Sequence, residues 1–205
     1  MENLIVKQGG KCFGSHVLFE EMSYTFEPNY FYALIGPSGS GKSTLLNCLG
    51  KLDNLSFGTI QLGMKDISEI KPLSYFRETV GFLFQNYALI EEETVKQNLN
   101  IVKKFSEIEL IASLERYGLS KTYLNRKVFT LSGGEAQRVA LARLKLQNPP
   151  IILADEPTGA LDEQNSELVL SSLLEMCRLG KIVIVATHDS SVVQLADQVV
   201  NLLEY

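Results

Sequence analysis

A run of small residues followed by a lysine and a hydroxyl residue has the composition needed to hold phosphate groups. Residues 36–43 read Gly-Pro-Ser-Gly-Ser-Gly-Lys-Ser and fit the pattern G-x-x-x-x-G-K-[ST] throughout. Small residues let the backbone curl so that several N–H groups point into one concavity, where phosphate oxygens can sit. The lysine supplies a full positive charge for the outer phosphates, and the serine hydroxyl is a hard oxygen ligand for Mg²⁺. The residues predicted to bind the phosphates are Gly36, Pro37, Ser38, Gly39, Ser40, Gly41, Lys42, Ser43 and Thr44, with Lys42 also assigned to catalysis and Ser43 to the metal.

The sequence on both sides of this phosphate loop predicts the elements that would position it. An apolar run at 31–35 predicts a buried strand, and residues 42–49 predict a helix whose positive dipole end faces the ligand. The alternative is a glycine-rich connection with no ligand, which an eight-residue match in this context disfavours. The loop by itself predicts a nucleotide binder and does not distinguish a kinase, a GTPase and a motor ATPase.

Two adjacent carboxylates, Asp155 and Glu156, follow the apolar run 151–154. The carboxyl ends of parallel strands face the crevice in which ligands bind. Because adjacent residues of a strand point to opposite sides, we expect different roles for the two acids. Asp155 is assigned to Mg²⁺, through water, and Glu156 to the water that attacks the phosphate. The alternative is a strand end with two solvated acids, and the phosphate loop in the same chain favours the metal and the base.

A second glycine-containing stretch, residues 131–138, reads Leu-Ser-Gly-Gly-Glu-Ala-Gln-Arg and precedes a predicted helix. Ser132 and Glu135 have the spacing of a capping box at a helix start. Two glycines inside such a cap weaken the helix, but they leave bare backbone N–H groups that an anion can approach closely. The stretch therefore predicts either an ordinary helix cap or a second anion-binding position.

With these residues in order, the chain resembles the ATP-binding subunits of ABC transporters from about residue 13 to residue 203. Residues 131–138 are similar to the signature motif of that family, and 159–162 to its D-loop. The resemblance implies a role for each of the following residues: Phe13 stacks on adenine, Gln85 contacts Mg²⁺ and the attacking water, His188 contacts the γ-phosphate, and Ser132, Gly133, Gly134, Glu135 and Asp162 contact nucleotide. Each has a simpler alternative, since Gln85 and His188 could be polar residues after strands and Phe13 a core aromatic. The family more often has tyrosine at the position of Phe13.

The resemblance also implies an activity and partners. ATP and Mg²⁺ would be the cofactors, and Glu156, His188, Gln85 and Lys42 the catalytic residues of ATP hydrolysis. Two copies of the chain would form a homodimer that sandwiches two ATP molecules, each between one copy's phosphate loop and the other's signature motif. A separate transmembrane permease would hold the protein at the cytoplasmic face of the cell membrane and would contact the loop at 85–94.

The sequences of two motifs resemble those of one branch of the family. Residues 154–162 and 84–87 look like the lipoprotein-release and macrolide-export branch, and 86–90 with 94–95 are similar to a short subgroup linked to bacteriocin export. This resemblance implies a bacterial exporter or extraction system for peptide, lipid or drug-like substrates. The chain stops at Tyr205, where most relatives continue with another strand pair, and we therefore expect no regulatory domain.

The elements that must carry these motifs follow from hydrophobic patterning. Short apolar runs at 31–35, 151–154 and 181–186 show no alternation, which is typical of strands buried on both faces in a parallel sheet. A helical pattern lies between the last two, with Asn165 and Ser166 as candidate caps and Gly180 as its end. We expect an α/β fold, a P-loop NTPase core of mainly parallel sheet with an antiparallel β subdomain and an inserted helical lobe. The core would comprise 1–85 and 147–205, and the lobe 86–146.

Composition restricts the class of protein. The 205 residues carry a net charge of −5, which argues against a nucleic-acid binder because such proteins usually have a basic excess. The three cysteines have no spacing typical of a metal site or a disulfide framework. There is no signal-peptide pattern and no apolar run near the roughly 20 residues of a membrane helix.

Three other functions would share the phosphate loop. A DNA-repair or chromosome-maintenance ATPase carries long coiled coils or zinc modules before the signature motif, and this chain has neither. A ribosome-associated factor carries two ATPase cassettes, and this chain has one. A small-molecule kinase would leave the stretch at 131–138 without a role. The sequence therefore favours the transporter subunit over all three.

Overall fold

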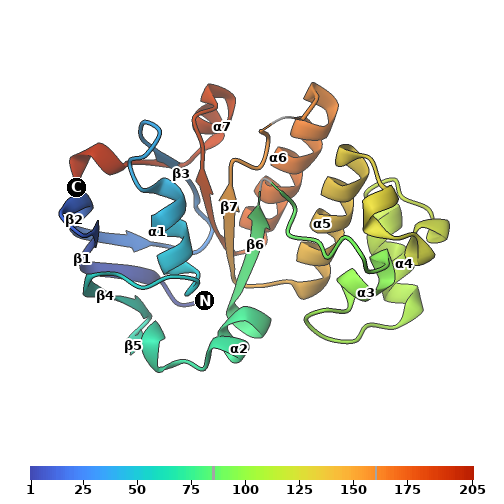
Figure 1. Cartoon of the computed structure of the whole chain (residues 1–205), viewed down its shortest axis with the longest axis horizontal. Coiled ribbons are helices and arrows are strands. Elements are labelled where there is room, and N and C mark those ends of the chain that lie inside the picture. Colours follow the sequence, from blue (N-terminus) through green and yellow to red (C-terminus); the bar gives the residue numbers. More distant parts are fainter. Residues whose placement is uncertain (85, 160) are drawn as a thin grey trace.

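The computed structural model describes residues 1–84, 86–159 and 161–205, and these residues are built on two β-sheets that lie side by side (Figure 1). Five parallel strands form the larger sheet, in the order β6-β7-β8-β3-β9, and four antiparallel strands form the smaller one, in the order β2-β1-β4-β5. The strands are β1 Leu4–Phe13, β2 His16–Phe26, β3 Phe31–Ile35, β4 Phe57–Leu62, β5 Lys65–Asp66, β6 Val80–Phe84, β7 Ile151–Asp155, β8 Ile182–Ala186 and β9 Gln198–Asn201. The helices are α1 Lys42–Leu49, α2 Pro72–Ser74, α3 Val95–Leu99, α4 Glu107–Arg116, α5 Gly133–Gln147, α6 Glu163–Arg178 and α7 Ser190–Leu195.

The central strands of the parallel sheet are buried on both faces, as their continuous apolar sequence predicts. Along β7, Ile151 and Leu153 belong to the core that includes α1, whereas Ile152 and Ala154 belong to the core that includes α5 and α6. Strand β8 alternates in the same way. Because each face of the sheet needs its own cover, α1 lies on one side of β6 and β7 and α5 on the other (Figure 1).

The antiparallel sheet packs on the α1 side of the parallel sheet, and the predicted antiparallel subdomain is confirmed. Leu4 and Val6 of β1 enter the core that holds Leu45 and Leu49 of α1. The ring of Phe57 lies over Gly10, where a Cβ atom would come within 2.1 Å of that ring. Only glycine at this position allows β4 to keep Phe57 across β1.

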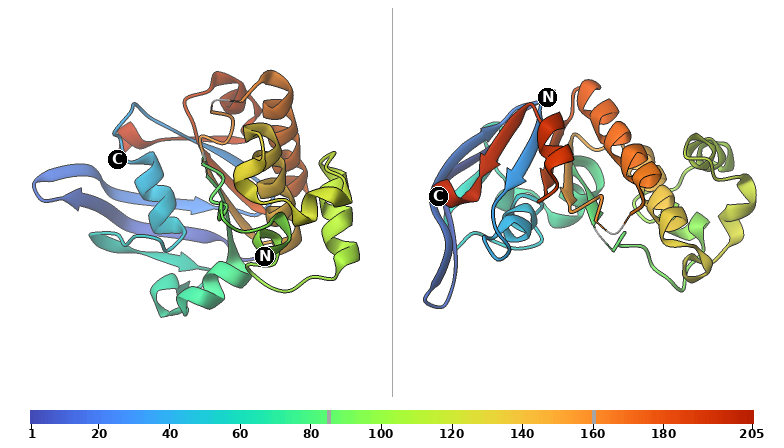
Figure 2. Two further views of the ribbon diagram at one scale, coloured as in Figure 1. Left: turned by 45° about the vertical axis from the view of Figure 1, so that its right-hand side comes forward. Right: turned by 90° about the horizontal axis from the view of Figure 1, so that it is seen from above.

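The region from 86 to 146 contains α3, α4 and most of α5, as Figure 2 shows in its yellow-green and gold segments. Helix α4 begins at Glu107, because Ser106 and Glu109 form a capping box there. Helix α5 starts in this region and packs back on the sheet with Leu144 against Gly81. The division of the chain into a core and a helical lobe stays a prediction.

A short antiparallel ladder crosses this helical region. The amide of Phe129 donates to Glu91 O at 3.2 Å, that of Val128 to Glu93 O at 3.1 Å, and that of Val95 to Arg126 O at 2.9 Å. These bonds tie the segment before α3 to the segment before α5. The chain between the end of β6 and α3 therefore contacts the stretch that leads into the signature motif.

The cap of α6 differs from the sequence interpretation. The helix begins at Glu163, and the Asp162 side chain accepts a hydrogen bond from the Asn165 amide, so Asp162 is the cap and neither Asn165 nor Ser166 is. The reason is that Asp162 keeps an extended backbone, with φ −69° and ψ 165°, while the next residues are already helical.

None of the helices in the described part of the chain combines the length and the apolar composition that crossing a membrane requires.

Candidate active site

The phosphate loop connects β3 to α1, as the sequence predicts. Gly39 and Gly41 have φ values of 82° and 93°, in the left-handed region that glycine reaches without strain. Gly41 caps α1 without a side-chain bond, and no acid lies in the first turn, so the first N–H groups of the helix keep their capacity for an anion. The Lys42 ammonium donates to Gly36 O at 2.8 Å and Pro37 O at 3.1 Å, which holds its charge over the loop.

A hollow beside this loop brings the predicted adenine-contacting residue to the predicted phosphate-binding residues. It is lined by Phe13, Leu18, Gly39, Gly41, Lys42, Ser43 and Thr44. Phe13 is 56 % exposed, so it is not a core aromatic. The Lys11 ammonium lies 5.0 Å from the centre of the Phe13 ring and is itself held by Asp53 at 2.8 Å. The β1–β2 turn and the phosphate loop thus form one recess that is apolar on one side and positive on the other.

The acid expected to hold the metal lies at the end of β7. Burial raises the pKa of Asp155, while a hydrogen bond from the Ser43 side chain and the charge of Lys42 act in the opposite direction. Asp155 therefore lies close to Ser43 and Lys42 of the phosphate loop. A hydroxyl and a carboxylate oxygen from two adjoining elements fit Mg²⁺, which usually takes one or two protein oxygens and leaves its other positions to water and phosphate.

Glu156 lies beyond the strand, which corrects the expectation that strand alternation separates it from Asp155. Its φ is 45°, a left-handed conformation that costs a residue with a Cβ atom about 1–2 kcal/mol. Two backbone bonds hold the turn, since its N–H donates to Ala186 O at 2.9 Å and its carbonyl accepts from the Gly159 amide at 3.0 Å. The reversal directs the side chain of Glu156 toward the segment after β8.

The side chains of Glu156 and His188 meet in the structure. Glu156 Oε1 lies 2.8 Å from His188 Nδ1, and Glu156 Oε2 accepts a hydrogen bond from the Thr187 hydroxyl at 3.4 Å. The imidazole is 80 % exposed and the carboxylate 19 %, so the histidine is the member that can change position. They border a hollow with Thr158, Gly159, Asp189 and Ser190.

The signature stretch, residues 131–135, lies away from these hollows. Ser132 caps α5 and forms a capping box with Glu135, with Ser132 N donating to Glu135 Oε2 at 2.7 Å and Glu135 N to Ser132 Oγ at 3.3 Å. Ser132 and Gly133 are exposed, and neither lines the hollow at the phosphate loop. The helix cap is therefore confirmed, and Gly133 stays exposed while Gly134 is half-buried. Binding of an anion at this stretch stays a prediction.

Two contacts that sequence reasoning missed join α5, the helix that follows the signature stretch, to the start of α6 and to the turn after β7. Asn165 Nδ2 donates to Asp162 Oδ2 at 2.7 Å, and Asn165 Oδ1 accepts from Arg138 Nη1 at 3.0 Å. A Cβ atom on Gly134 would come within 2.8 Å of Asn165 Nδ2. Gln137 of the same helix donates to Pro157 O at 3.3 Å. The polar residues of α5 were visible in the sequence, but their partners are distant along the chain.

Arg143 is a further residue that the sequence did not single out. Its guanidinium donates to Ala88 O at 2.6 Å and Tyr87 O at 3.0 Å, and burial lowers its pKa to about 10. It holds Tyr87 and Ala88, two residues with positive φ that begin two positions after Gln85. Gln85 itself, assigned to the metal and the attacking water, lies outside the described residues.

Comparisons with known proteins agree with this geometry. Residues 19–159 match the model of a protein family described as ABC transporter. The chain is 40 % identical over 193 residues to the ABC transporter ATP-binding protein YvrO of Bacillus subtilis, covering 89 % of this chain and 84 % of YvrO. It is 38 % identical to the macrolide export ATP-binding/permease protein MacB of Hyphomonas neptunium and 37 % identical to the pyoverdine export ATP-binding/permease protein PvdT of Pseudomonas entomophila. Each match covers 88 % of this chain but only 30 % of MacB and 29 % of PvdT.

Solved structures give the same result for the fold. The dimeric structure of MJ0796, a bacterial ABC transporter cassette, superposes with a TM-score of 0.84 at 30 % identity and covers 97 % of this chain and 94 % of that one. A second dimeric structure of MJ0796, in a post-hydrolysis state with ADP and Pi, also has a TM-score of 0.84 at 30 % identity. It covers 97 % of this chain and 93 % of that one.

Proposed function

The chain belongs to the ABC transporter family, and from this premise we propose how its residues divide the work of binding and hydrolysing ATP. It is the nucleotide-binding ATPase subunit of a bacterial exporter-type transporter. The observation that carries the residue assignments is the contact between Glu156 and His188, directly after the strand whose end, Asp155, adjoins the phosphate loop.

Binding is assigned to the loop and the recess beside it. The N–H groups of residues 38–44 would hold the phosphates, with Lys42 moving its charge from the carbonyls of Gly36 and Pro37 to the β- and γ-phosphates. Ser43 and Asp155 would hold Mg²⁺, which when bound offsets negative charge on the phosphates. Gln85 is assigned to the same metal and the attacking water from the family resemblance alone.

Hydrolysis is assigned to Glu156 and His188. The Glu156 carboxylate would take a proton from the water that attacks the γ-phosphate in line. Its hydrogen bonds with His188 and Thr187 fix the carboxylate where the turn after β7 places it. The exposed imidazole would turn to the γ-phosphate once ATP is bound. In this assignment, the phosphate loop binds ATP and the turn after β7 takes the proton, and Asp155 lies between these two segments.

Removing divalent metal is the first test of this proposal. We expect phosphate release from ATP to fall to background in excess EDTA and to return when Mg²⁺ is added back, because Ser43 and Asp155 then regain their ligand. ATP titration in EDTA reports whether binding survives without the metal. Hydrolysis that persists at full rate in EDTA, or that rises on adding DNA, RNA or ribosomes, would contradict the proposal.

We further propose that two copies of the chain form a head-to-tail homodimer on binding ATP. The support is that Ser132 and Gly133 are exposed and that α5 and α1 lie on opposite sides of the parallel sheet (Figure 1). A single chain therefore does not bring its signature stretch over its own phosphate loop. An isologous twofold pair would complete two sites at once, and the related cassette MJ0796 has been solved as a dimer.

The proposed partner is a separate transmembrane permease, which would hold this protein at the cytoplasmic face of the cell membrane. YvrO, of which this chain covers 84 %, is described as an ABC transporter ATP-binding protein, which supports a permease on another polypeptide here. MacB and PvdT are ATP-binding/permease proteins of which this chain spans about a third. The docking position would be the loop at 85–94, in which Ile90 is 47 % exposed, together with the neighbouring Phe129, which is 57 % exposed. The finer assignment, to the lipoprotein-release and macrolide-export branch and its bacteriocin-linked subgroup, rests on the motifs alone, as do peptide, lipid or drug-like substrates. Nucleic acid is not among the proposed partners.

If adenine stacks on Phe13, removing the Phe13 ring should weaken the binding of ligands that carry the base and of no others. We expect Phe13→Ala to weaken ATP binding by about 5- to 100-fold, the range of one base–aromatic stack. Binding of inorganic tripolyphosphate should stay unchanged, because it contacts the phosphate loop alone. Isothermal titration of both ligands measures the difference, and Phe13→Tyr should retain ATP affinity. An equal loss for both ligands, or none for ATP, would contradict the stacking assignment.

A further inference from the structure

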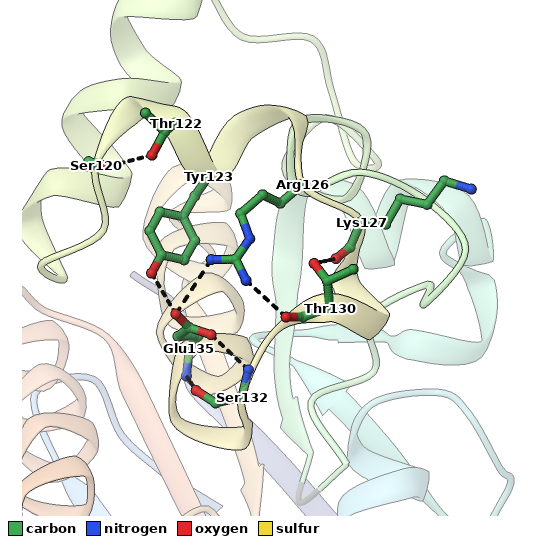
Figure 3. A network of polar contacts seen from close by, with 8 residues as sticks. All are labelled: Ser120, Thr122, Tyr123, Arg126, Lys127, Thr130, Ser132 and Glu135. Carbon is green, nitrogen blue, oxygen red and sulfur yellow. Dashed lines mark hydrogen bonds and ion pairs between the residues drawn. The ribbon is translucent and has the colours of Figure 1, made fainter.

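A polar cluster around Glu135 holds the start of α5 (Figure 3), and it includes Tyr123 and Arg126, to which no role has been assigned above. The Tyr123 hydroxyl donates to Glu135 Oε1 at 2.5 Å, and Arg126 Nη1 lies 3.6 Å from the same oxygen. The other oxygen, Oε2, accepts from the Ser132 backbone at 2.7 Å. Both carboxylate oxygens of Glu135 therefore have partners within the chain, which fixes the orientation of this side chain in the capping box.

Arg126 is itself fixed by its neighbours. Its guanidinium carbon lies 4.6 Å from the centre of the Tyr123 ring, and its Nη2 donates to Thr130 O at 2.9 Å. The Thr130 hydroxyl in turn donates to Lys127 O at 2.7 Å. These contacts span the last turn before the signature stretch, as Figure 3 shows. The conformation of the chain that enters Ser132 is thus set by the same arginine that faces Glu135.

The negative charge of Glu135 affects both the stability of α5 and the approach of an anion to its start. The hydrogen bond from Tyr123 is the main influence that lowers the pKa of Glu135, so the carboxylate stays ionised at neutral pH. An ionised carboxylate in the first turn stabilises the helix. The same charge repels a phosphate that approaches the Gly133 and Gly134 N–H groups unless a cation beside it offsets the charge. Arg126 is that cation.

We propose that Tyr123 and Arg126 are positioning residues that orient Glu135 in the capping box and offset its charge, so that the signature stretch can receive the γ-phosphate of ATP held by a second copy of this chain. This inference rests on the proposed ATP-dependent dimer. Tyr123 acts through Glu135 on the orientation of Ser132, and Arg126 acts on both the orientation and the local potential. Neither residue touches the nucleotide of its own chain.

The test measures dimer formation apart from ATP binding. The background variant is Glu156→Gln, in which hydrolysis does not remove the ATP, and the dimer is followed by sedimentation velocity at rising protein concentration with ATP and Mg²⁺. We expect Tyr123→Phe to weaken dimerisation by at least about tenfold, since it removes one hydrogen bond to a charged group from each of two sites. Binding of ATP to the monomer at low protein concentration should be unchanged.

The matched control is Thr122→Ala. It removes the 2.7 Å contact between the Ser120 and Thr122 hydroxyls in the same turn, which Figure 3 shows apart from the cluster around Glu135. We expect this variant to dimerise like the background. Equal losses in Thr122→Ala and Tyr123→Phe would mean that any change in this turn disturbs the dimer, and the inference would be wrong.

A charge rescue separates the role of Arg126 from simple packing. We expect Arg126→Met to weaken dimerisation by more than tenfold, because it leaves the Glu135 charge facing the incoming phosphate. Adding Glu135→Gln to Arg126→Met should restore most of the dimer, since the amide keeps the cap geometry without the charge. A purely structural arginine would show no such rescue, and absence of rescue overturns the electrostatic half of the inference.

The failure of this inference can be told from failure of the dimer proposal. If Glu156→Gln alone shows no ATP-dependent dimer, the proposed function is wrong. If that dimer forms and Tyr123→Phe leaves its dissociation constant unchanged, the dimer stands and the positioning role is wrong. A lower melting temperature together with weaker ATP binding by the Tyr123→Phe monomer would show a general effect on the fold and would also overturn the inference.

Discussion

Replacing Glu156 by glutamine is expected to abolish steady-state ATP hydrolysis while ATP stays bound. A glutamine has the size of glutamate and can keep a hydrogen bond to His188, but its amide cannot accept the proton of the attacking water. A positioned general base contributes about 10²–10⁴-fold to a rate, so phosphate release should fall by at least about 100-fold. The trapped ATP should also hold the dimer together, which sedimentation velocity can detect.

The matched control for this variant is Glu163→Gln, the same change in the exposed first turn of α6. It should retain the normal rate of phosphate release and should not accumulate a dimer. If Glu156→Gln hydrolysed ATP as fast as the unmodified chain, another group would have to take the proton, and the assignment of Glu156 would be wrong.

Replacing Ser132 by arginine is expected to block hydrolysis and leave ATP binding intact. Ser132 is exposed at the start of α5, where a long cationic side chain would prevent the approach of a second phosphate loop. We expect phosphate release to fall by about 100-fold or more, as when other single contacts to a reacting group are removed. An equilibrium titration with ATP should give the affinity of the unmodified chain, because the phosphate loop is untouched.

Ser106→Arg provides the control for the lost helix cap. Ser106 closes an equivalent capping box with Glu109 at the start of α4, so its replacement should cost a similar free energy of unfolding, about 1 kcal/mol. Its hydrolysis should be normal if the effect at Ser132 comes from the second nucleotide site. Loss of ATP binding in Ser132→Arg would place Ser132 on the site of its own chain instead.

Local signals in the sequence were sufficient for the elements that carry the phosphate loop. The strand at 31–35 and the helix at 42–49 have the predicted bounds, because an apolar run and a glycine-rich turn fix both within a few residues. The capping box of Ser132 and Glu135 is likewise a short-range pattern and is confirmed. The parallel sheet of the α/β core followed from apolar runs without alternation, which are typical of strands buried on both faces.

Contacts between residues distant in the sequence could not be predicted in this way. Nothing in the spacing of Tyr123, Arg126 and Glu135 indicates that their side chains meet, since this depends on how the turn before α5 folds. The cap of α6 was assigned to Asn165 and Ser166 because Asn, Ser and Asp all suit a helix start, and only backbone angles choose Asp162. The turn at Glu156 was missed because a non-glycine residue with positive φ has no sequence signal.

The backbone of Glu156 has a consequence for selection on this chain. Glycine would occupy φ 45° without a Cβ clash, and asparagine tolerates it better than glutamate does. Both would free the fold from an unfavourable residue, and both would lack the reach or the charge that the site requires. The chain therefore keeps a carboxylate where folding alone would select another residue. A screen that selects for heat resistance alone would therefore tend to recover inactive variants at position 156. At this residue, thermal stability and the rate of ATP hydrolysis impose opposite demands.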